Sequence, residues 1–473
     1  MLLPRATPSS MQFSASAISS LLDHLEERGI ECHSLMVVHR GRIIAEGWWA
    51  PYSADQPHLL YSLTKSFMSV AVGIAVNDGL LRLDDRVVDI LPDHVPDDAS
   101  EQARALTVQH LLTMTTGHAE DTLGDAWALE PTDLVRGFLR MPVTAASGSH
   151  HTYDNSSTFV LARMVERVTG TPLPTLLDER LFAPLGITDI EWDRVGDGAV
   201  YGFHGLHLTT ESVAAFGELM LRGGAWQGRP ILSQDWMAEA TRKQVDSRHY
   251  SPGAPGVDFH AGYGYQIWSS TYGFHGNGAF GQQCIVVPDQ ELVVVLTAAH
   301  SEVRHAQDVL DAVRCFVVPG VGGARDDDQD AALARRVSEL SLPMVEGTLG
   351  GASSAICATL DASPSGSALA EGTPVVVEQR AHGWIIRLGL DIEIAVGFDS
   401  WRESRPLGRP VVSSGAWQRD TFVADLHLVT SPHRVRLTVR KSTAHLVWVT
   451  VPLTTSDLTL HLKSPLMTRP DMA

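Results

Sequence analysis

The stretch from residue 62 to residue 76 is apolar on nearly every side and ends at Asn77-Asp78-Gly79. A helix on a protein surface carries one apolar stripe, whereas a helix that is apolar all round is buried. Glycine just after the last turn is a common helix C-cap. We therefore expect a buried helix at the centre of a domain, with other elements packed around it.

Strand-like runs lie on both sides of a mainly helical middle. The runs 35–38 and 43–45 flank His39-Arg40-Gly41-Arg42 and predict a hairpin. Helical patterns alternate with loops from Leu106 to about Gly224. Further strands are predicted at 263–268, 283–287 and 292–296, with a closing helix at 303–316. Strands from both ends of a domain commonly join one sheet, so we expect a mixed α+β fold: an antiparallel sheet with helices on it and an all-α subdomain beside it.

At 473 residues the chain is too long for one ordinary core, and its composition changes at Pro319-Gly320-Val321-Gly322-Gly323. We place a first domain at 1–318, a linker containing a short helix at 319–343 and a second domain at 344–473. Alternating runs in the second domain predict a small antiparallel barrel or sandwich. These runs are 375–377, 384–388, 392–396, 422–428, 435–439 and 446–451.

Composition narrows the partners and the compartment. Hydrophobic residues make up 44% and charged residues 19% of the chain, which is typical of a globular protein. The formal net charge of -19 repels phosphate backbones and anionic lipids, so we expect neither nucleic acid nor membrane as a partner. No signal peptide is visible at the N-terminus, and the 4 cysteines form no CxxC pair. We expect a cytoplasmic protein with reduced thiols.

A serine and a lysine open the apolar helix as Ser62-Leu63-Thr64-Lys65. Residues three apart share a helix face, so the lysine amine can lie beside the serine hydroxyl. Burial disfavours the charged amine, and a neutral amine can accept the serine's proton. Taken alone, the four-residue pattern also fits an ordinary first turn of a helix.

A second candidate element, Tyr153-Asp154-Asn155, lies just before the helical pattern 158–169. A tyrosine near a lysine can accept or donate a proton, and an asparagine offers both hydrogen-bond senses for fixing the lysine and a substrate. The alternative is an asparagine that caps the helix beside a packed tyrosine.

Together these residues resemble the serine β-lactamase and penicillin-binding-protein superfamily, in particular its class C β-lactamase, DD-peptidase and family VIII esterase branch. The resemblance covers about residues 15 to 317 and implies a transpeptidase-like domain in which Ser62 is the nucleophile, Lys65 and Tyr153 move protons, and Asn155 holds the site together. Supporting phrases occur in family order: Leu83-Asp84-Asp85-Arg86-Val87, Leu106-Thr107-Val108-Gln109-His110-Leu111-Leu112, Thr116-Gly117, Pro184-Leu185-Gly186 and Val287-Pro288-Asp289-Gln290-Glu291-Leu292.

One element of this superfamily, Lys-Thr-Gly, is absent, and the corresponding stretch runs from His275 through Gly276, Asn277 and Gly278 to Gln282. In β-lactamases that lysine helps hold the substrate carboxylate, so its loss implies weak β-lactam hydrolysis. His275 is the candidate stand-in, as in relatives with His-x-Gly; a loop histidine beside a tight glycine turn is the alternative. By analogy, backbone amides of Ser62 and of a residue near Asn277 form the oxyanion hole.

Other histidines indicate no metal site. His150-His151 and the pair His204 and His207 lack a third ligand at zinc-site spacing, so we predict neither a metal nor another cofactor. The second domain resembles the lipocalin-like β domain appended to some members of the superfamily, on the basis of Gly415-Ala416-Trp417 and Asp420-Thr421-Phe422. A structural lid without a ligand fits the same residues.

We therefore expect a serine hydrolase that cleaves carboxylic esters or amides of a small-molecule or peptidyl acyl substrate through an acyl-Ser62 intermediate. One alternative is a penicillin-binding-protein-type thioesterase or acyltransferase, in which an amine captures the acyl group and cyclises a peptide. Another is a non-catalytic binding module, which is disfavoured because Ser62, Lys65, Tyr153 and Asn155 are all present. The sequence leaves the oligomeric state open.

Overall fold

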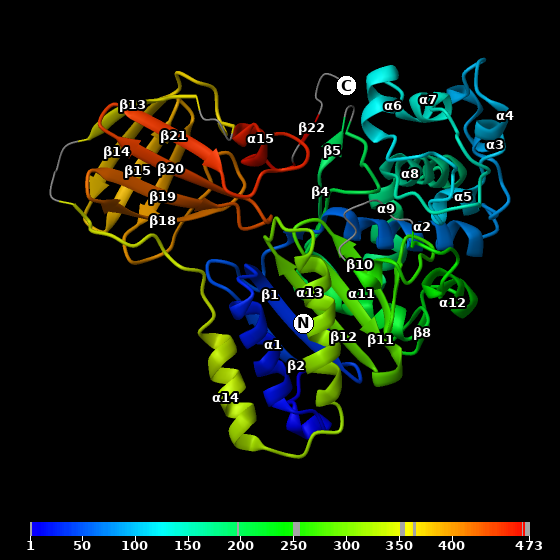
Figure 1. Cartoon of the computed structure of the whole chain (residues 1–473), viewed down its shortest axis with the longest axis horizontal. Coiled ribbons are helices and arrows are strands. Elements are labelled where there is room, and N and C mark those ends of the chain that lie inside the picture. Colours follow the sequence, from blue (N-terminus) through cyan, green and yellow to red (C-terminus); the bar gives the residue numbers. More distant parts are fainter. Residues whose placement is uncertain are drawn as a thin grey trace.

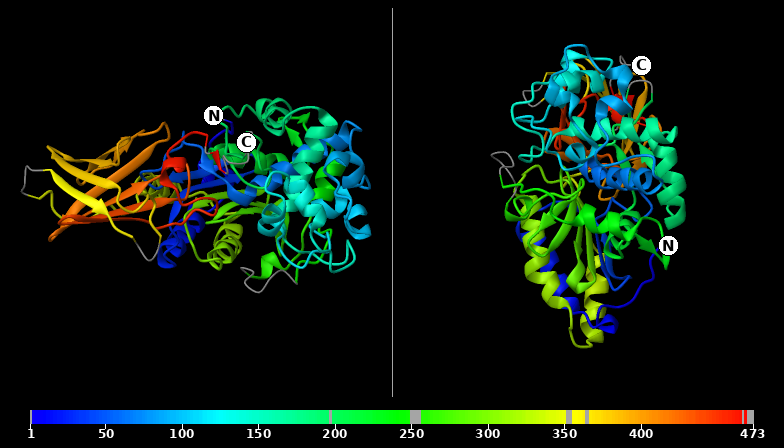
Figure 2. Two further views of the ribbon diagram at one scale, coloured as in Figure 1. Left: turned by 90° about the horizontal axis from the view of Figure 1, so that it is seen from above. Right: turned by 90° about the vertical axis from the view of Figure 1, so that its right-hand side faces the viewer.

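The computed structural model describes residues 2–195, 198–248, 256–350, 355–362, 366–465 and 467–468. A β-barrel lies at one end of the elongated molecule and a helical subdomain at the other, with a sheet between them (Figures 1 and 2). The mixed α+β fold predicted from the sequence is confirmed. The domain boundaries at 318 and 344 stay predictions.

The central sheet has six antiparallel strands in the order β2-β1-β12-β11-β10-β9. The predicted hairpin is present, and strands from the two ends of the first 300 residues pair directly, β1 with β12. The strands are β1 (Cys32–His39), β2 (Arg42–Trp48), β9 (Trp268–Ser270), β10 (Gly273–Gly278), β11 (Gln282–Val287) and β12 (Leu292–Ala298).

The strand predicted at 263–268 is wrong, because the chain turns there. Gly264 N donates to the Ile267 carbonyl at 2.8 Å, and Gln266 has a positive φ of 60°. Tyr263 and Trp268 face each other across this turn in an isolated bridge, and β9 begins only at Trp268. The alternating aromatic residues are buried around a turn and not along a strand.

Alternate residues of β1 and β12 face two cores. Met36 and Val293 pack with the helices α2 (Thr64–Asn77) and α11 (Thr210–Leu221), while Val37 and Val294 pack with helices on the other face. Helices of that second face are α1 (Ala15–Glu27), α13 (His305–Ala312), which continues into a π-helical turn at Val313–Val317, and α14 (Asp327–Ser338). As predicted, α2 is buried almost along its whole length.

The helical subdomain packs around α2 and α8 (Figure 1). Its helices are α3 (Val87–Ile90), α4 (Glu101–Arg104), α5 (Val108–Leu112), α6 (Leu123–Leu129), α7 (Leu134–Arg140), α8 (Asn155–Thr169), α9 (Leu173–Leu177) and α10 (Ala183–Leu185). Helix α12 (Gln234–Thr241) packs its Trp236 against Gly73 of α2. Short strands complete this part of the chain: β3 (His58–Leu59), β4 (Glu191–Trp192), β5 (Arg194–Val195), β6 (Leu206–Leu208), β7 (Ala225–Trp226), β8 (Arg229–Pro230) and β22 (Met467–Thr468).

The second domain is a closed barrel, which decides between the two predicted architectures. Pairing of β16 with β18 closes a ring of eight strands, with β17 outside it. Its interior is filled by a cluster of apolar side chains that includes Trp384, Phe422 and Leu437. The elements are β13 (Ile356–Leu360), β14 (Pro374–Arg380), β15 (Gly383–Leu388), β16 (Ile392–Gly397), β17 (Arg402–Ser404), β18 (Val411–Gln418), β19 (Thr421–His427), β20 (Arg434–Arg440), β21 (Thr443–Trp448) and α15 (Leu458–His461).

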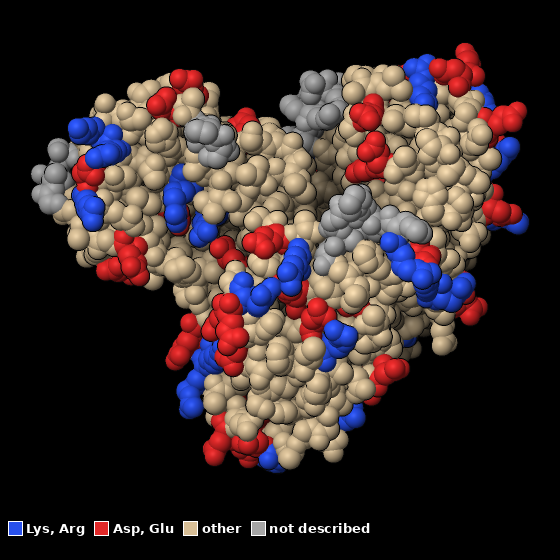
Figure 3. Space-filling model, viewed as in Figure 1, with Lys and Arg blue, Asp and Glu red and all other residues tan. Residues whose placement is uncertain are grey.

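Charge on the molecular surface is mixed. On the face shown in Figure 3, Lys and Arg side chains stand beside Asp and Glu side chains and do not gather into one basic patch. Among the residues that the structure describes, no helix combines the length and the apolar character needed to cross a membrane.

Candidate active site

Ser62 lies where a 3-10 turn, Tyr61–Leu63, runs into α2. The preceding residue, Tyr61, has a φ of 49°, a left-handed conformation that is strained for a bulky side chain. Strained backbone is maintained only where surrounding contacts require it, and Tyr61 is buried and hydrogen-bonded. This turn sets the position of the Ser62 hydroxyl at the start of the buried helix.

Lys65 is fully buried and lies beside the serine, as the three-residue spacing predicted. Its Nζ donates to Ser62 Oγ at 3.0 Å, to Asn155 Oδ1 at 2.7 Å and to the Phe203 carbonyl at 3.2 Å. Burial lowers the pKa of Lys65 to about 7, although two nearby carboxylates act in the opposite direction. A substantial fraction of the amine is therefore neutral near pH 7 and able to accept a proton.

Asn155 is the first residue of α8, but it does not cap that helix. Asp154 is the N-cap and accepts from the Ser156 backbone at 3.0 Å. The Asn155 side chain is thereby left to project toward Lys65. Its Nδ2 donates to Asp121 Oδ2 at 2.6 Å, which fixes the amide with its oxygen facing the lysine.

Asp121 was missed by the sequence analysis. It holds both the side chain and the backbone N–H of Asn155, the latter at 3.1 Å, and its charge raises the pKa of Lys65. It lies 34 residues before Asn155 in a loop that carries no motif, so only the folded chain brings it to the site.

Tyr153 lies on the other side of the lysine. The Lys65 Nζ is 4.8 Å from the centroid of its ring, and the ring stacks on Trp268 with centroids 5.7 Å apart and planes 10° apart. Tyr153 and Ser62 line the same cavity. The structure thus brings together the four residues Ser62, Lys65, Tyr153 and Asn155.

The stretch that replaces Lys-Thr-Gly forms the end of β10, next to the turn that carries Ser62. A methyl group on Gly276 would lie 2.3 Å from Leu63 Cδ1, and one on Gly278 would lie 2.1 Å from the Leu60 carbonyl. Both positions therefore require glycine for close packing. Asn277 lies in the wall of the cavity that contains Ser62.

His275 lies one layer behind this wall. It is fully buried, with Nδ1 2.7 Å from Ser270 Oγ and its ring packed edge-on against Phe259, which does line the cavity. Burial lowers the pKa of His275 to about 4, so the ring is neutral near pH 7. In that state it offers a substrate carboxylate no positive charge.

Ser62 opens onto two cavities. The smaller cavity, of about 310 Å³, is lined by Tyr153, Trp268, Asn277, Gly278 and Phe280 among others. The larger cavity, of about 550 Å³, is lined among others by Leu123, Trp127, Asn155, Tyr201 and Phe203. Leu453, from a loop of the barrel, lines both.

Two carboxylates lie beside His207, one of the histidines considered as metal ligands in the sequence. Glu191, Asp193 and His207 offer ligand atoms within 4.8 Å of one another. The buried Arg409 of the barrel contacts Glu191 and lies 3.7 Å from Asp193. A protein cation therefore already pairs with both carboxylates of this group and ties the barrel to the first domain.

A serine hydroxyl bonded to a buried lysine of lowered pKa, with a tyrosine and an asparagine beside it, defines a serine-hydrolase type of site. The family model described as Beta-lactamase matches residues 18–314, and the chain belongs to this family. The resemblance inferred from the sequence is confirmed.

Two proteins are similar to this chain in sequence, and one solved structure shares its fold. The 6-aminohexanoate-dimer hydrolase of Paenarthrobacter ureafaciens is 27% identical over 319 residues, which cover 61% of this chain and 79% of that protein. Esterase EstB of Burkholderia gladioli is 30% identical over 210 residues, 38% of this chain and 53% of that protein. The solved structure of EstCE1, described as a hydrolase with promiscuous acyltransferase activity, superposes with a TM-score of 0.52 and 17% identity over 63% of this chain and 98% of that one.

Proposed function

We propose that the protein is a serine hydrolase of carboxylic esters or amides that works through an acyl-Ser62 intermediate. The observation that carries the proposal is the 3.0 Å contact between Ser62 Oγ and the Nζ of a lysine whose pKa burial lowers to about 7. A neutral amine at this distance can take the hydroxyl proton as the oxygen attacks a carbonyl carbon. The names of two relatives, a dimer hydrolase and an esterase, support this reaction class.

The developing oxyanion needs donors that are in place before the reaction. The Ser62 backbone N–H and the end of β10 are the candidates. Pairing of β10 with β9 covers only Gly273 to His275, so among the described residues the outer edge at Gly276 to Gly278 has no strand partner. This free edge beside Ser62 supports the predicted oxyanion role of the stretch 276–278.

The leaving group has to receive a proton when the tetrahedral intermediate collapses. Tyr153 lines the smaller cavity together with Ser62, and Lys65 lies beneath its ring. In our proposal the proton taken from Ser62 passes through Lys65 or Tyr153 to the departing oxygen or nitrogen. Water then gives a proton to the same base while its oxygen attacks the acyl carbon, and the base returns that proton to Ser62 Oγ as the bond between Oγ and the acyl carbon breaks and the acid leaves.

Neutral acyl groups fit the site better than anionic ones. Among the described residues lining either cavity there is neither lysine nor arginine, and the smaller cavity includes Glu302. His300 lines it too, but burial lowers its pKa to about 4, so it is uncharged near pH 7. This favours simple esters and amides over β-lactams, which carry a carboxylate.

A fluorophosphonate probe with intact-protein mass spectrometry tests the proposal. We expect one adduct on the wild-type protein and none on Ser62→Ala. Ser66→Ala is the matched control, because it removes a buried hydroxyl from the same helix, bonded to the Gln266 carbonyl at 3.2 Å, and should keep the adduct. Labelling of Ser62→Ala at the wild-type level would exclude Ser62 as the nucleophile.

Substrate class and acceptor are read from a panel of p-nitrophenyl esters, D-amino-acid amides and peptide thioesters. We expect acyl-enzyme mass shifts followed by free acid in the presence of a competing amine. Amide product in excess of acid would favour the acyltransferase alternative.

A further inference from the structure

A loop of the barrel, residues 449–457 between β21 and α15, reaches the catalytic residues. Its Leu453 lines the smaller and the larger cavity, as Ser62 does. Thr454 and Thr455 extend the wall of the larger cavity, and Leu460 of α15 adds a further apolar side chain. The second domain therefore supplies part of the surface that a substrate at Ser62 would contact.

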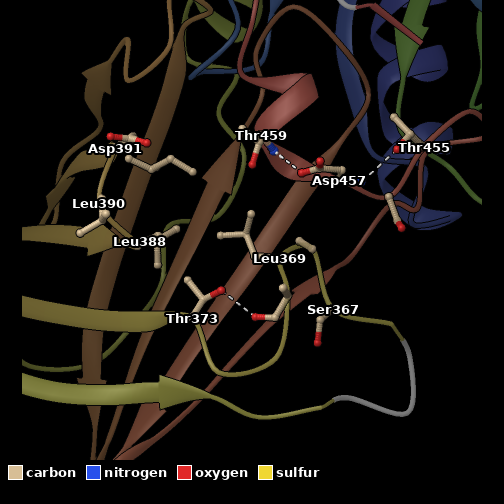
Figure 4. Close-up of a pocket in the computed structure, with 14 residues that line it drawn as sticks. Ser367, Leu369, Thr373, Leu388, Leu390, Asp391, Thr455, Asp457 and Thr459 are labelled. Carbon is tan, nitrogen blue, oxygen red and sulfur yellow. Dashed lines mark hydrogen bonds between the residues drawn. The ribbon is translucent and has the colours of Figure 1, made fainter. Parts of the chain in front are cut away.

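The loop is held firmly by the barrel on its far side. Trp448 Nε1 donates to the Ser456 carbonyl at 2.8 Å, and the Thr455 carbonyl lies 2.8 Å from His461 Nε2. Asp457 accepts from the Thr459 backbone at 2.8 Å, a bond drawn in Figure 4. Thr455 lines the larger cavity on one side and a barrel cavity of about 610 Å³, shown in Figure 4, on the other. The loop is thus held in place by hydrogen bonds and forms part of the wall of both cavities.

The loop is also tied to the nucleophile's own turn. The Thr450 carbonyl of the loop lies 2.9 Å from His433 Nδ1, and Nε2 of the same ring lies 2.6 Å from the Tyr61 hydroxyl. The Leu453 backbone also lowers the pKa of Tyr61, in opposition to the larger effect of burial. Yet Leu453 is 67% exposed. The loop is therefore held by its neighbouring residues, while Leu453 remains open to contact a ligand.

The cavities differ in chemistry. The larger one is bounded by Leu123, Trp127, Tyr201, Phe203 and Leu460, and no described lysine, arginine, aspartate or glutamate lines it. The smaller one contains Tyr153, the only described tyrosine in its wall, and the end of β10. Where Tyr153 hands the proton to the leaving group, that group lies in the smaller cavity, and the acyl chain is left to the larger one.

Resting on the proposed function, we propose that Leu453 is a specificity-determining residue that separates an acyl cavity from a leaving-group cavity. The substrates it selects are esters or amides of bulky apolar acyl groups, arylalkanoyl or branched, with a compact leaving group. Binding energy from the acyl chain against the aromatic wall then lowers the barrier at Ser62.

The test compares acyl groups on one leaving group. kcat/KM is measured for p-nitrophenyl 4-phenylbutyrate and p-nitrophenyl acetate with the wild-type protein, Leu453→Ala and Val451→Ala. Val451 is the matched control, since it lies on the same loop, is 51% exposed and is not among the residues that line either cavity. We expect the wild type to favour the bulky ester at least tenfold, Leu453→Ala to reduce this ratio at least fivefold, and Val451→Ala to keep it within twofold.

A second readout separates this inference from the proposed function. The second readout is the rate at which Ser62 is labelled by an arylalkyl fluorophosphonate and by a methyl fluorophosphonate. Labelling requires only attack by the serine. The ratio of the arylalkyl rate to the methyl rate should fall in Leu453→Ala, as the ratio of the ester kcat/KM values does. If Ser62 is not labelled, the proposed function fails. If Ser62 is labelled and both ratios are equal in Leu453→Ala and Val451→Ala, the function stands and the role of Leu453 is refuted.

Discussion

The hydroxyl of Tyr61, the residue before Ser62, lies 2.6 Å from Nε2 of His433 in the barrel. Burial lowers the pKa of His433 well below its usual value, so the ring is neutral. Its Nδ1 lies 2.9 Å from the Thr450 carbonyl, which can only accept, so Nδ1 carries the proton and Nε2 accepts from Tyr61. The barrel is therefore bonded to the strained turn that positions Ser62.

Tyr61→Phe removes this bond and leaves Nε2 of His433 buried without its partner. We expect the free energy of unfolding to fall by about 1–3 kcal/mol, measured by urea denaturation. In a double-mutant cycle with His433→Leu, the double variant should lose less than the sum of the two single losses, by about 1 kcal/mol. Additive losses would mean that the two side chains act independently.

Tyr153→Phe keeps the ring that stacks on Trp268 and removes only the hydroxyl. We expect kcat for the best ester to fall about a hundredfold or more, the usual scale for losing a proton-transfer group, with the fold intact by circular dichroism. Tyr272→Phe is the matched control, because its hydroxyl donates to the Leu310 carbonyl at 2.8 Å outside both cavities, and its kcat should stay within threefold. An unchanged kcat in Tyr153→Phe would show that the Tyr153 hydroxyl transfers no proton and that the residue contributes only packing.

Cephalosporins should be poor substrates. The family's lysine is replaced at Gly276 or His275, and neither offers a cation, since a side chain at position 276 would collide with Leu63 and the His275 ring is neutral near pH 7. We expect kcat/KM for a chromogenic cephalosporin to be at least a hundredfold below that for the best neutral ester. Equal rates would show that another group binds the carboxylate.

Much of the fold was predictable because its elements carry local signals. The all-apolar pattern at 62–76 identified α2, and β-rich runs identified β1, β2, β11 and β12. The prediction at 263–268 failed because burial of alternating aromatic residues is not unique to strands. There the hydrogen bond from Gly264 to Ile267 reverses the chain, and nothing in the local composition indicates it.

The residues of the candidate site also differ in whether the sequence alone identifies them. Ser62 and Lys65 are linked by helical spacing, and Tyr153 and Asn155 lie in one short phrase, so these residues could be found in the sequence. Asp121 could not, because it is one of 55 acidic residues and has no motif. Leu453 reaches the site only through packing of one domain on the other, which no spacing rule describes.

The pH dependence of acylation should report the protonation of Lys65. The amine accepts a proton only when neutral, and its pKa is about 7 because burial outweighs the attraction of Asp121 and Asp154. The neutral fraction grows as the pH rises through 7, so kcat/KM should increase about tenfold per pH unit below this value and level off above it.

Asp121→Asn removes a carboxylate that raises the pKa of Lys65. The acid limb of the variant's kcat/KM profile should therefore move to lower pH, and the variant should keep more of its own plateau activity at pH 6 than the wild type does. Asp125→Asn, which makes the same charge change on α6 but is not among the groups acting on Lys65, should leave the limb in place. An acid limb that stays fixed or moves to higher pH in Asp121→Asn would show that Lys65 is not the base.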